Sequence, residues 1–348
     1  MNPRTLVVLL SLTLSSAVFA QTPDSPVAYM QYLSDRDLQM SQKYLSYMSE
    51  VAHGNRARKM EKRRQELINE IRQSLGEAGR LKPFKGDASL RDAYKSYWDI
   101  LLKVFNEDYH KIVNMEEIAE QSYDNMEAYL LAQEKAEEVL DAEAEKIHPV
   151  YESFAAKNNI RLIEKDSKLS QKLRQVGAVN SYYHHLYLIF FKAHKQEAYM
   201  LDAFNKGNVN ATEQNRTTLI RFADEGLQKL DTIKPFKGDG SLVNNCRKVL
   251  EFHKNEAEVH MPVQSAFLLK KSEFEKIRKA MESKPAAKRT QSDIDNYNNA
   301  VKEFNDAVNS SNASLQAVNS GREKTLTNWD NAVKRFMELH VPKGVPKK

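Results

Sequence analysis

The sequence contains one cysteine, Cys246, in 348 residues. A single cysteine excludes an internal disulfide, so packing alone has to stabilise the fold, and the chain is long enough for that. No nearby residue suggests a base that would activate the thiol. We therefore expect Cys246 to be buried and chemically inert.

Glycine and proline are scarce as well, with 11 and 10 residues. The low glycine content argues against a phosphate-binding loop, and the sequence has no Gly-x-Ser-x-Gly elbow and no His-Glu-x-x-His motif. These absences remove common markers of nucleotide binding and of hydrolysis. We therefore expect a protein that is not an enzyme and that uses no cofactor.

Long apolar runs are missing after the first residues. The longest, 186–191, has six residues, which is too few to span a membrane. The N-terminus differs, because Arg4 precedes the apolar stretch 6–14, and Val18-Phe19-Ala20 then provides a cleavage site. This pattern predicts a signal peptide at 1–20. We expect export to the periplasm, cell surface or extracellular medium, without a transmembrane span.

Neither sign of charge dominates the sequence. Lysine and arginine number 52 against 47 aspartates and glutamates, which gives a formal net charge of +5. Because both signs are mixed along the chain, the composition favours a soluble surface over a dedicated nucleic-acid-binding face. Export also argues against nucleic acid. The expected partner is an envelope component, a glycan or another protein, and the sequence does not specify which.

The peptide Lys-Pro-Phe-Lys-Gly-Asp occurs twice, at 82–87 and at 234–239, an offset of 152 positions. The match extends outward without gaps, since Leu-Ile, Tyr-Met and Ser-Leu pairs recur at the same offset. Such a repeat indicates one structural unit that is used twice. We predict a first helical repeat at 21–160, a second at 161–340, and a flexible basic tail at 341–348.

Between the turns, apolar residues recur at steps of three and four, which is the helical period. No segment shows convincing alternation, so we expect no sheet. The predicted helices lie at 27–53, 56–80, 88–113, 116–158, 166–206, 210–231, 241–282 and 290–340. The fold class is therefore all-α, with two tandem four-helix-bundle-like repeats. At ~1.5 Å per residue the last helix would extend about 75 Å, which predicts an elongated molecule.

Three features should interrupt these helices. Pro149 and Pro262 lie inside helical patterns, and proline removes a backbone donor there. The stretch Asn309–Ser320 is rich in asparagine and serine, which are weak helix formers. We expect a break or kink at each proline and a weak point in the last helix.

The repeated hexapeptide is typical of a turn between two helices. Pro83 would end one helix, Gly86 would adopt a left-handed conformation, and Asp87 or Ser89 would cap the next helix, with equivalents in the second copy. The main hypothesis is structural. Under the alternative, Lys85 and its counterpart Lys237 bind an anion beside a helix N-terminus.

Two Glu-x-x-His sequences are the strongest enzymatic pattern. They supply Glu107 with His110 and Glu145 with His148, the ligand pairs used by di-iron carboxylate bundles. However, the two motifs fall on consecutive predicted helices, and the second repeat keeps neither at the matching position. We therefore predict no metal site, and these four residues stay as an alternative.

A second set, His253, Glu256 and His260, would share one face of a straight helix and has ligand types that suit zinc. Because no fourth ligand is evident, we expect these residues to face solvent or to form hydrogen bonds between helices. The aromatic residues of 182–191 are expected to be buried between the two repeats. The alternative is a groove for an apolar or glycan ligand.

The densest positive charge lies at 56–64, at the start of a predicted helix. The basic residues singled out there are Arg56, Arg58, Lys59, Arg63 and Arg64. A solvated helix face is the simplest account. The alternative is contact with an anionic polymer or an envelope surface, and the matching stretch of the second repeat keeps only one basic residue.

The signal peptide, the tyrosine- and lysine-rich helices and the twice-used Lys-Pro-Phe-Lys-Gly-Asp turn resemble a family of secreted helical bacterial surface proteins, leptospiral in type, with relatives in Bacteroidota. The resemblance implies export and assigns no activity and no catalytic residue. The sequence therefore leads us to expect an exported, non-enzymatic envelope or surface protein with a binding or structural role. The alternatives are a metal-binding bundle and a periplasmic ligand-binding or sensor module.

Overall fold

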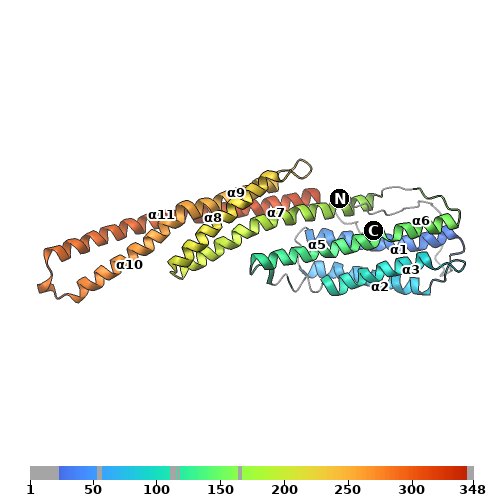
Figure 1. Cartoon of the computed structure of the whole chain (residues 1–348), viewed down its shortest axis with the longest axis horizontal. Coiled ribbons are helices and arrows are strands. Elements are labelled where there is room, and N and C mark those ends of the chain that lie inside the picture. The colour runs from blue at the N-terminus through green and yellow to red at the C-terminus, as the bar shows by residue number, and fades with distance from the viewer. Residues whose placement is uncertain (1–22, 53–56, 110–114, 116–117, 164–166, 343–348) are drawn as a thin grey trace. The chain divides into compact units, whose positions relative to one another are not determined.

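A computed structural model describes residues 23–52, 57–109, 115, 118–163 and 167–342 (Figure 1). These residues form helices and contain no β-strand, which confirms the predicted all-α class. Within them, no helix combines the length and the apolar character that crossing a membrane requires. The predicted signal peptide, His110, Arg56 and the end of the tail lie outside the described residues.

The helices closely follow the predicted pattern. Their bounds are α1 Pro26–Ala52, α2 Ala57–Arg80, α3 Ser89–Lys103, α5 Tyr123–Glu145, α6 Ile147–Lys157, α7 Lys168–Asn205, α8 Val209–Thr232, α9 Ser241–Asn255, α10 Met261–Ser283 and α11 Gln291–His340. Two π-helical turns, η1 (Val104–Asp108) and η2 (Glu256–His260), and one 3-10 turn, η3 (Ala286–Lys288), complete the described elements.

The chain forms two compact units. Unit 1 comprises Met1–His184 with Arg335–Lys348, and unit 2 comprises His185–Lys334. The predicted boundary at 160/161 precedes α7, whereas the observed division falls inside it. The reason is that α7 is one continuous helix, whose first part contributes buried Val176 and Val179 to unit 1.

Apolar helix faces build each unit. In unit 1, α1 packs on α2, α2 packs on α3, and α3 packs on α5 and α6. Trp98 and Phe105 are fully buried there. In unit 2, α8 packs on α9, and α10 follows directly from η2. Burial of these apolar stripes is the main force that holds each bundle together.

The repeated hexapeptide forms the same turn in both units. Lys85 and Gly86 have φ of 49° and 86°, and Lys237 and Gly238 have φ of 50° and 88°. Two left-handed residues in succession make a tight two-residue reversal of the chain. In unit 1, Phe84 and Asp87 close this turn with reciprocal backbone hydrogen bonds of 3.0 and 2.9 Å. The left-handed glycines were predicted, but the left-handed lysines were not.

The aspartate of each turn caps the following helix. Asp87 Oδ1 accepts a hydrogen bond from the Ser89 backbone N–H at 2.8 Å, and Asp239 Oδ1 accepts one from Ser241 at 2.8 Å. These bonds satisfy backbone donors that the first helical turn leaves without an intrahelical partner. The aspartate therefore satisfies the first backbone donor of the helix from the position before the N-cap residue, which is Ala88 in unit 1 and Gly240 in unit 2.

The two π-helical turns also lie 152 positions apart, which the sequence did not predict. Each receives a hydrogen bond from an arginine of a neighbouring helix. Arg64 Nη1 of α2 donates to the Phe105 carbonyl at 2.5 Å, and Arg216 Nη1 of α8 donates to the Ala257 carbonyl at 3.3 Å. A π-turn disrupts the regular backbone bonding pattern, so the arginine satisfies a displaced carbonyl.

The predicted helix breaks have different outcomes. A break does occur before Pro149, since α5 ends at Glu145 and α6 begins at Ile147. Pro262 falls in the first turn of α10, directly after η2, where a missing N–H is tolerated. The α11 helix runs without interruption from Gln291 to His340, through the stretch in which a weak point was expected.

Candidate metal-binding site in unit 2

The site begins on α7, where two ionisable residues continue an aromatic face. His194 lies one turn after Phe190, and the two rings stack at 5.2 Å between centroids. Phe190 in turn stacks on Trp329 of α11 at 4.7 Å. Glu197 follows His194 by three positions, so both side chains emerge from the same side of the helix. The aromatic packing fixes where these two polar groups lie.

The opposite wall comes from α9 and η2. His253 lies near the end of α9, and Glu256 opens the π-helical turn. Their exposed fractions are 0% and 1%, and Glu197 is 2% exposed. Two carboxylates and an imidazole are thus removed from solvent together, an arrangement that is costly unless the groups are paired or bind a cation.

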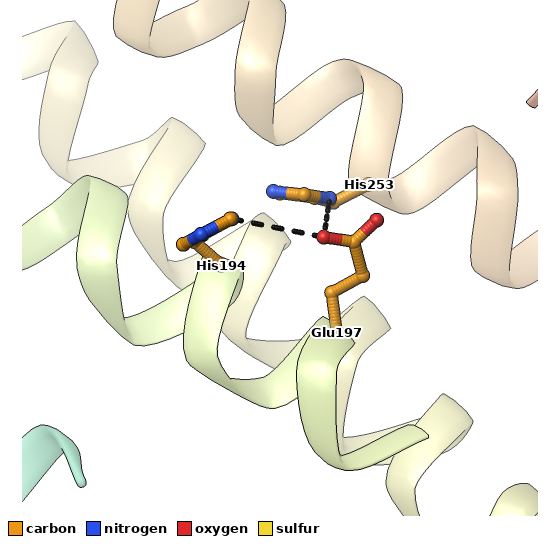
Figure 2. A group of neighbouring side chains, drawn as sticks. All are labelled: His194, Glu197 and His253. Carbon is orange, nitrogen blue, oxygen red and sulfur yellow. Dashed lines mark ion pairs between the residues drawn. The ribbon is translucent and has the colours of Figure 1, made fainter. Parts of the chain in front are cut away.

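The polar atoms of this group converge (Figure 2). Glu197 Oε2 lies 3.5 Å from His253 Nδ1 and 3.7 Å from His194 Nδ1. One ligand atom from each of the three residues lies within 4.8 Å of the others. Glu256 Oε2 lies 4.0 Å from His253 Nδ1, at the edge of this group.

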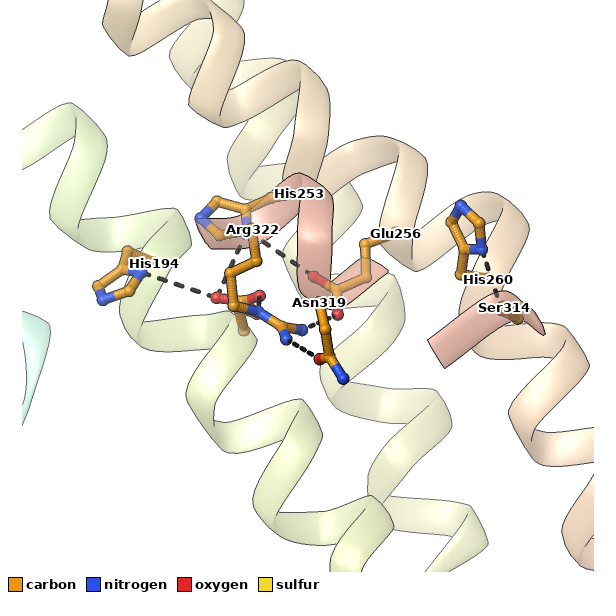
Figure 3. Close-up of polar contacts among 8 residues, drawn as sticks. His194, His253, Glu256, His260, Ser314, Asn319 and Arg322 are labelled. Carbon is orange, nitrogen blue, oxygen red and sulfur yellow. Dashed lines mark hydrogen bonds and ion pairs between the residues drawn. The ribbon is translucent and has the colours of Figure 1, made fainter. Parts of the chain in front are cut away.

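Arg322 of α11 holds both carboxylates from the far side (Figure 3). Its Nε donates to Glu197 Oε1 at 2.6 Å, its Nη2 donates to Glu256 Oε1, and its Nη1 donates to Asn319 Oδ1 at 2.9 Å. The guanidinium therefore occupies one oxygen of each carboxylate. The other oxygens, both Oε2, face the histidines.

Burial sets the protonation of the histidines. Burial lowers the pKa of His253, although the charge of Glu197 acts in the opposite direction. Burial also lowers the pKa of His194, and the positive charge of a protonated His253 would lower it further. Both imidazoles are consequently neutral near pH 7, the form that binds metal ions. Burial also raises the pKa of Glu197, while the charges of His253 and Arg322 oppose that change.

Several polar atoms of the group lack hydrogen bonds. His194 Nδ1, both ring nitrogens of His253 and Glu256 Oε2 are buried and find no hydrogen-bond partner among the described residues. Buried polar groups are nearly always satisfied, and each exception calls for an explanation. Here the exceptions lie side by side, and their chemistry is that of metal ligands.

A glycine lets α11 approach this wall. A Cβ at Gly321 would lie 2.9 Å from Cε2 of Phe252, which is closer than packed atoms permit. Gly321 immediately precedes Arg322, and Phe252 immediately precedes His253. The close contact therefore sets the distance between the guanidinium and the α9 wall.

The repeat shows that the scaffold does not require these charges. At the 152-residue offset, Glu197, His253 and Glu256 correspond to Leu45, Leu101 and Val104 of unit 1. Those three residues are buried core positions. Unit 1 thus uses apolar side chains at the corresponding positions, so the polar group is specific to unit 2.

The Glu-x-x-His residues do not form such a group. Glu107 and Glu145 are exposed, and His148 Nε2 lies 3.7 Å from Glu152 on its own helix. Within the described residues, the one group of His, Cys, Asp and Glu side chains with metal-binding proximity is His194, Glu197 and His253. His110 lies outside the described residues, so the di-iron alternative gains no support.

The set His253, Glu256 and His260 separates in the structure. His253 and Glu256 join the buried group, whereas His260 Nδ1 lies 2.9 Å from Ser314 Oγ of α11. The π-helical turn explains the difference, because it changes the angular spacing that a straight helix would give. The expected hydrogen bond between helices is therefore found at His260, with Ser314, and at Glu256, with Arg322, whereas His253 is buried and its ring nitrogens have no hydrogen-bond partner among the described residues.

The basic run is largely engaged inside unit 1. Lys59 Nζ pairs with Glu50 at 2.7 Å, and Arg63 pairs with Glu66 at 2.8 Å. Arg64 is buried and pairs with Glu61 at 2.8 Å as well as with the η1 carbonyl. A fully solvated face is therefore wrong for Arg64, which is a structural residue. Arg58 lies in α2, and the structure does not describe its side chain.

The remaining candidates have local roles. Lys85 and Lys237 are exposed, and their Nζ atoms lie 5.5 and 5.7 Å from the ring centroids of the preceding phenylalanines. Such contacts are cation–π interactions that stabilise the turn. Cys246 is buried, and burial raises the pKa of its thiol to about 12, as expected for an inert cysteine.

Sequence reasoning missed His194, Glu197 and Arg322. One signal was present: His194 and Glu197 extend the aromatic stripe of α7, and ionisable residues on such a stripe are candidates for burial. Arg322 gave no signal, because only the packing of α11 brings it to the carboxylates. No protein-family model, curated protein or solved structure matches this chain, and the geometry of the site is therefore the basis for its interpretation.

Proposed function

We propose that this chain is an exported, non-enzymatic helical binding protein whose second unit binds a transition-metal ion, with Zn²⁺ as the best match. The ligands are His194 Nδ1, His253 Nδ1 and Glu197 Oε2. The observation that carries the proposal is the convergence of buried, unpaired ring nitrogens on a carboxylate oxygen. Neutral imidazole and carboxylate are normal ligands for zinc and for related divalent ions.

The spacing supports a tetrahedral centre. With metal–ligand bonds of about 2.0 to 2.1 Å, ligand atoms of a tetrahedral site lie about 3.3 Å apart. The separations of 3.5 and 3.7 Å between Glu197 Oε2 and the two ring nitrogens are close to that value, and the three ligand atoms all lie within 4.8 Å of one another. Glu256 Oε2 or a solvent molecule would complete the coordination.

The charge balance also supports a bound cation. With neutral histidines and both carboxylates ionised, Glu197, Glu256 and Arg322 would leave one uncompensated negative charge in a buried volume, and the raised pKa of Glu197 reflects that cost. A divalent ion would offset it, and Arg322 would act as the outer partner that orients both carboxylates, as groups behind metal ligands commonly do. Glu197 and His253 are buried, whereas the His194 side chain is 35% exposed, so a metal ion could reach the site from the His194 side.

Elemental analysis of the purified chain, followed by calorimetric titration with Zn²⁺, tests the proposal. We expect about one ion per chain, and we expect His253→Ala and Glu197→Gln to weaken Zn²⁺ binding at least tenfold, because each removes a ligand. His260→Ala is the matched control, since His260 lies on η2 outside the ligand group, and it should bind as the original chain does.

A variant with apolar residues tests whether a loss of Zn²⁺ binding results from misfolding. Glu197→Leu, His253→Leu and Glu256→Val copy the residues of unit 1, and Arg322→Met removes the cation that would lose its partners. This chain should fold and bind no Zn²⁺. If it binds Zn²⁺ as tightly as the original chain, the proposed site is wrong.

A further inference from the structure

Unit 1 contains a cavity of about 430 Å³ that the metal-binding proposal does not use. Residues of α1, α2, α3, α5, α6 and the first part of α7 line it, so it lies wholly within this unit. A cavity of this size is in the range that takes a small organic ligand. Its lining indicates which chemistry that ligand has.

Three carboxyl groups face the cavity, those of Asp37, Glu137 and Asp141. Asp37 accepts a hydrogen bond from Trp98 Nε1 at 3.4 Å, and Glu137 accepts one from the side chain of Asn180. Neither of these two hydrogen bonds comes from a cationic side chain, and Asp141 lies about one turn after Glu137 on α5. These groups therefore produce a negative potential in the cavity.

Positive charge is sparse around the cavity. Arg174 and His148 are the basic side chains of its described lining, and His148 already lies 3.7 Å from Glu152. Glu134 and Glu138 add further acidic groups to the lining. An anionic ligand would thus meet net repulsion.

Aromatic side chains supply the rest of the wall. Four tyrosines line the cavity together with two methionines; the tyrosines are Tyr44, Tyr94, Tyr97 and Tyr151. Aromatic faces attract organic cations through cation–π interactions and pack against apolar groups. Among the described residues, the ligand atoms of the cavity carboxylates do not converge on one point as those of His194, Glu197 and His253 do. A bare metal ion therefore fits this wall poorly.

Unit 2 fills the equivalent positions. At the 152-residue offset, Asp37, Tyr94 and Tyr97 correspond to Ile189, Cys246 and Val249, all of which are buried. The bundle can therefore close this region with apolar side chains. Unit 1 instead places acidic and phenolic groups around an open volume.

We propose that the unit 1 cavity binds a small organic cation, an amine or quaternary ammonium with an apolar body. Asp37, Glu137 and Asp141 neutralise its charge, and the tyrosines pack against its body. Binding a cationic group in this cavity satisfies the carboxylates and occupies the apolar wall at the same time.

Three probes of similar shape and different charge test the proposal. Phenethylamine is cationic, phenethyl alcohol is neutral and hydrocinnamate is anionic at pH 7.5; phenethyltrimethylammonium adds a quaternary cation. Calorimetric titration of the full chain should show binding of both cations, with the neutral and anionic probes at least tenfold weaker. Equal affinity for phenethylamine and phenethyl alcohol would overturn the proposal, as would failure of both cations to bind at millimolar concentration.

Matched variants locate the site. Asp37→Asn and Glu137→Gln should each weaken phenethylamine binding at least fivefold, because each removes a charge and keeps the side-chain shape. Glu127→Gln is the control, since Glu127 is exposed on the same helix as Glu137 and bonds to Tyr123 outside the cavity. Unchanged phenethylamine affinity in Asp37→Asn and Glu137→Gln would show that the cation binds elsewhere and that the proposal is wrong.

Discussion

Individual acidic residues carry unusual protonation in unit 1. Burial raises the pKa of Asp37 to about 6, although the Trp98 hydrogen bond opposes it. Burial and the neighbouring charges of Asp141 and Glu134 raise the pKa of Glu137 to about 7. The other titratable or charged groups that line the cavity are Tyr44, Tyr94, Tyr97, Glu138, His148, Tyr151 and Arg174. Folding therefore retains protons on Asp37 and Glu137 that the unfolded chain releases at a lower pH.

This protonation predicts a pH dependence of stability. Because the folded-state pKa values lie above the unfolded values, the stability of unit 1 should fall as pH rises from about 4 to about 7. Glu137→Gln should remove part of this fall and add on the order of 1 kcal/mol at pH 8. Thermal unfolding at pH 5 and pH 8 measures the effect, and Glu127→Gln should leave the difference unchanged.

Asp87 shows the opposite behaviour. Its hydrogen bonds with Ser89, and then its contact with Lys157 at 3.1 Å, lower the pKa of its carboxyl to about 2. The stabilisation is therefore present above the unfolded pKa and is lost as pH falls through about 2.

Replacement of Asp87 tests its capping role. Asp87→Ala should cost about 1 kcal/mol of unfolding free energy at pH 7, because it removes a helix cap. The same substitution should have much less effect near pH 2. An equal loss at both pH values, measured by urea unfolding, would contradict this account.

At the scale of single elements, α11 shows how packing overrides helix propensity. Its asparagine- and serine-rich stretch contains weak helix formers, yet the helix is continuous. Ser311 Oγ donates to Gln264 Oε1 at 2.7 Å, and Gln264 Nε2 donates to the Ser311 carbonyl at 3.1 Å. Contacts between helices, including that of Ser314 with His260, offset the low intrinsic propensity.

Gly321 provides a test of the same helix. Gly321→Ala should destabilise the chain by about 1 to 3 kcal/mol, since the new methyl group would overlap Phe252, even though alanine favours helix. Gly76→Ala on α2 is the control: it has open space and should stabilise by about 0.5 to 1 kcal/mol. Chemical denaturation of both variants measures the difference, and a stabilising Gly321→Ala would show that the contact is unimportant.

At the scale of the whole molecule, each unit carries polar groups where the other has an apolar core. Unit 2 has Glu197 and His253 at the positions of Leu45 and Leu101, and unit 1 has Asp37 at the position of Ile189. The shared turn, π-helical turn and arginine contact keep the scaffold constant. The differences between the units are therefore the residues to which we assign binding.

The apolar variant of the metal site tests the cost of this specialisation. Without metal, replacing Glu197, His253, Glu256 and Arg322 with leucine, leucine, valine and methionine should raise the unfolding free energy by about 1 to 4 kcal/mol, because a buried ionic group is exchanged for hydrophobic packing. Thermal unfolding in the presence of a chelator measures this change. A large loss of stability would instead indicate that the ionic group is structural.

Much of the fold was predictable because its determinants are local. The period of apolar residues located most of the helices, and the repeated hexapeptide located the turn with its glycine and its capping aspartate. The π-helical turns escaped prediction, since no local residue pattern distinguishes them from α-helix. The weak point expected in α11 produces no break in the helix, because α10 and η2 supply contacts that helix propensity does not include.

The sequence alone determined the all-α class, the repeat and the principal turns, since these depend on neighbouring residues along the chain. Only the tertiary structure decided which polar residues act together. Arg322 lies 125 positions from Glu197, and Trp98 lies 61 positions from Asp37. Helix packing brings these residues into contact, and burial then changes their protonation, so neither the metal site nor the cavity is visible in local sequence patterns.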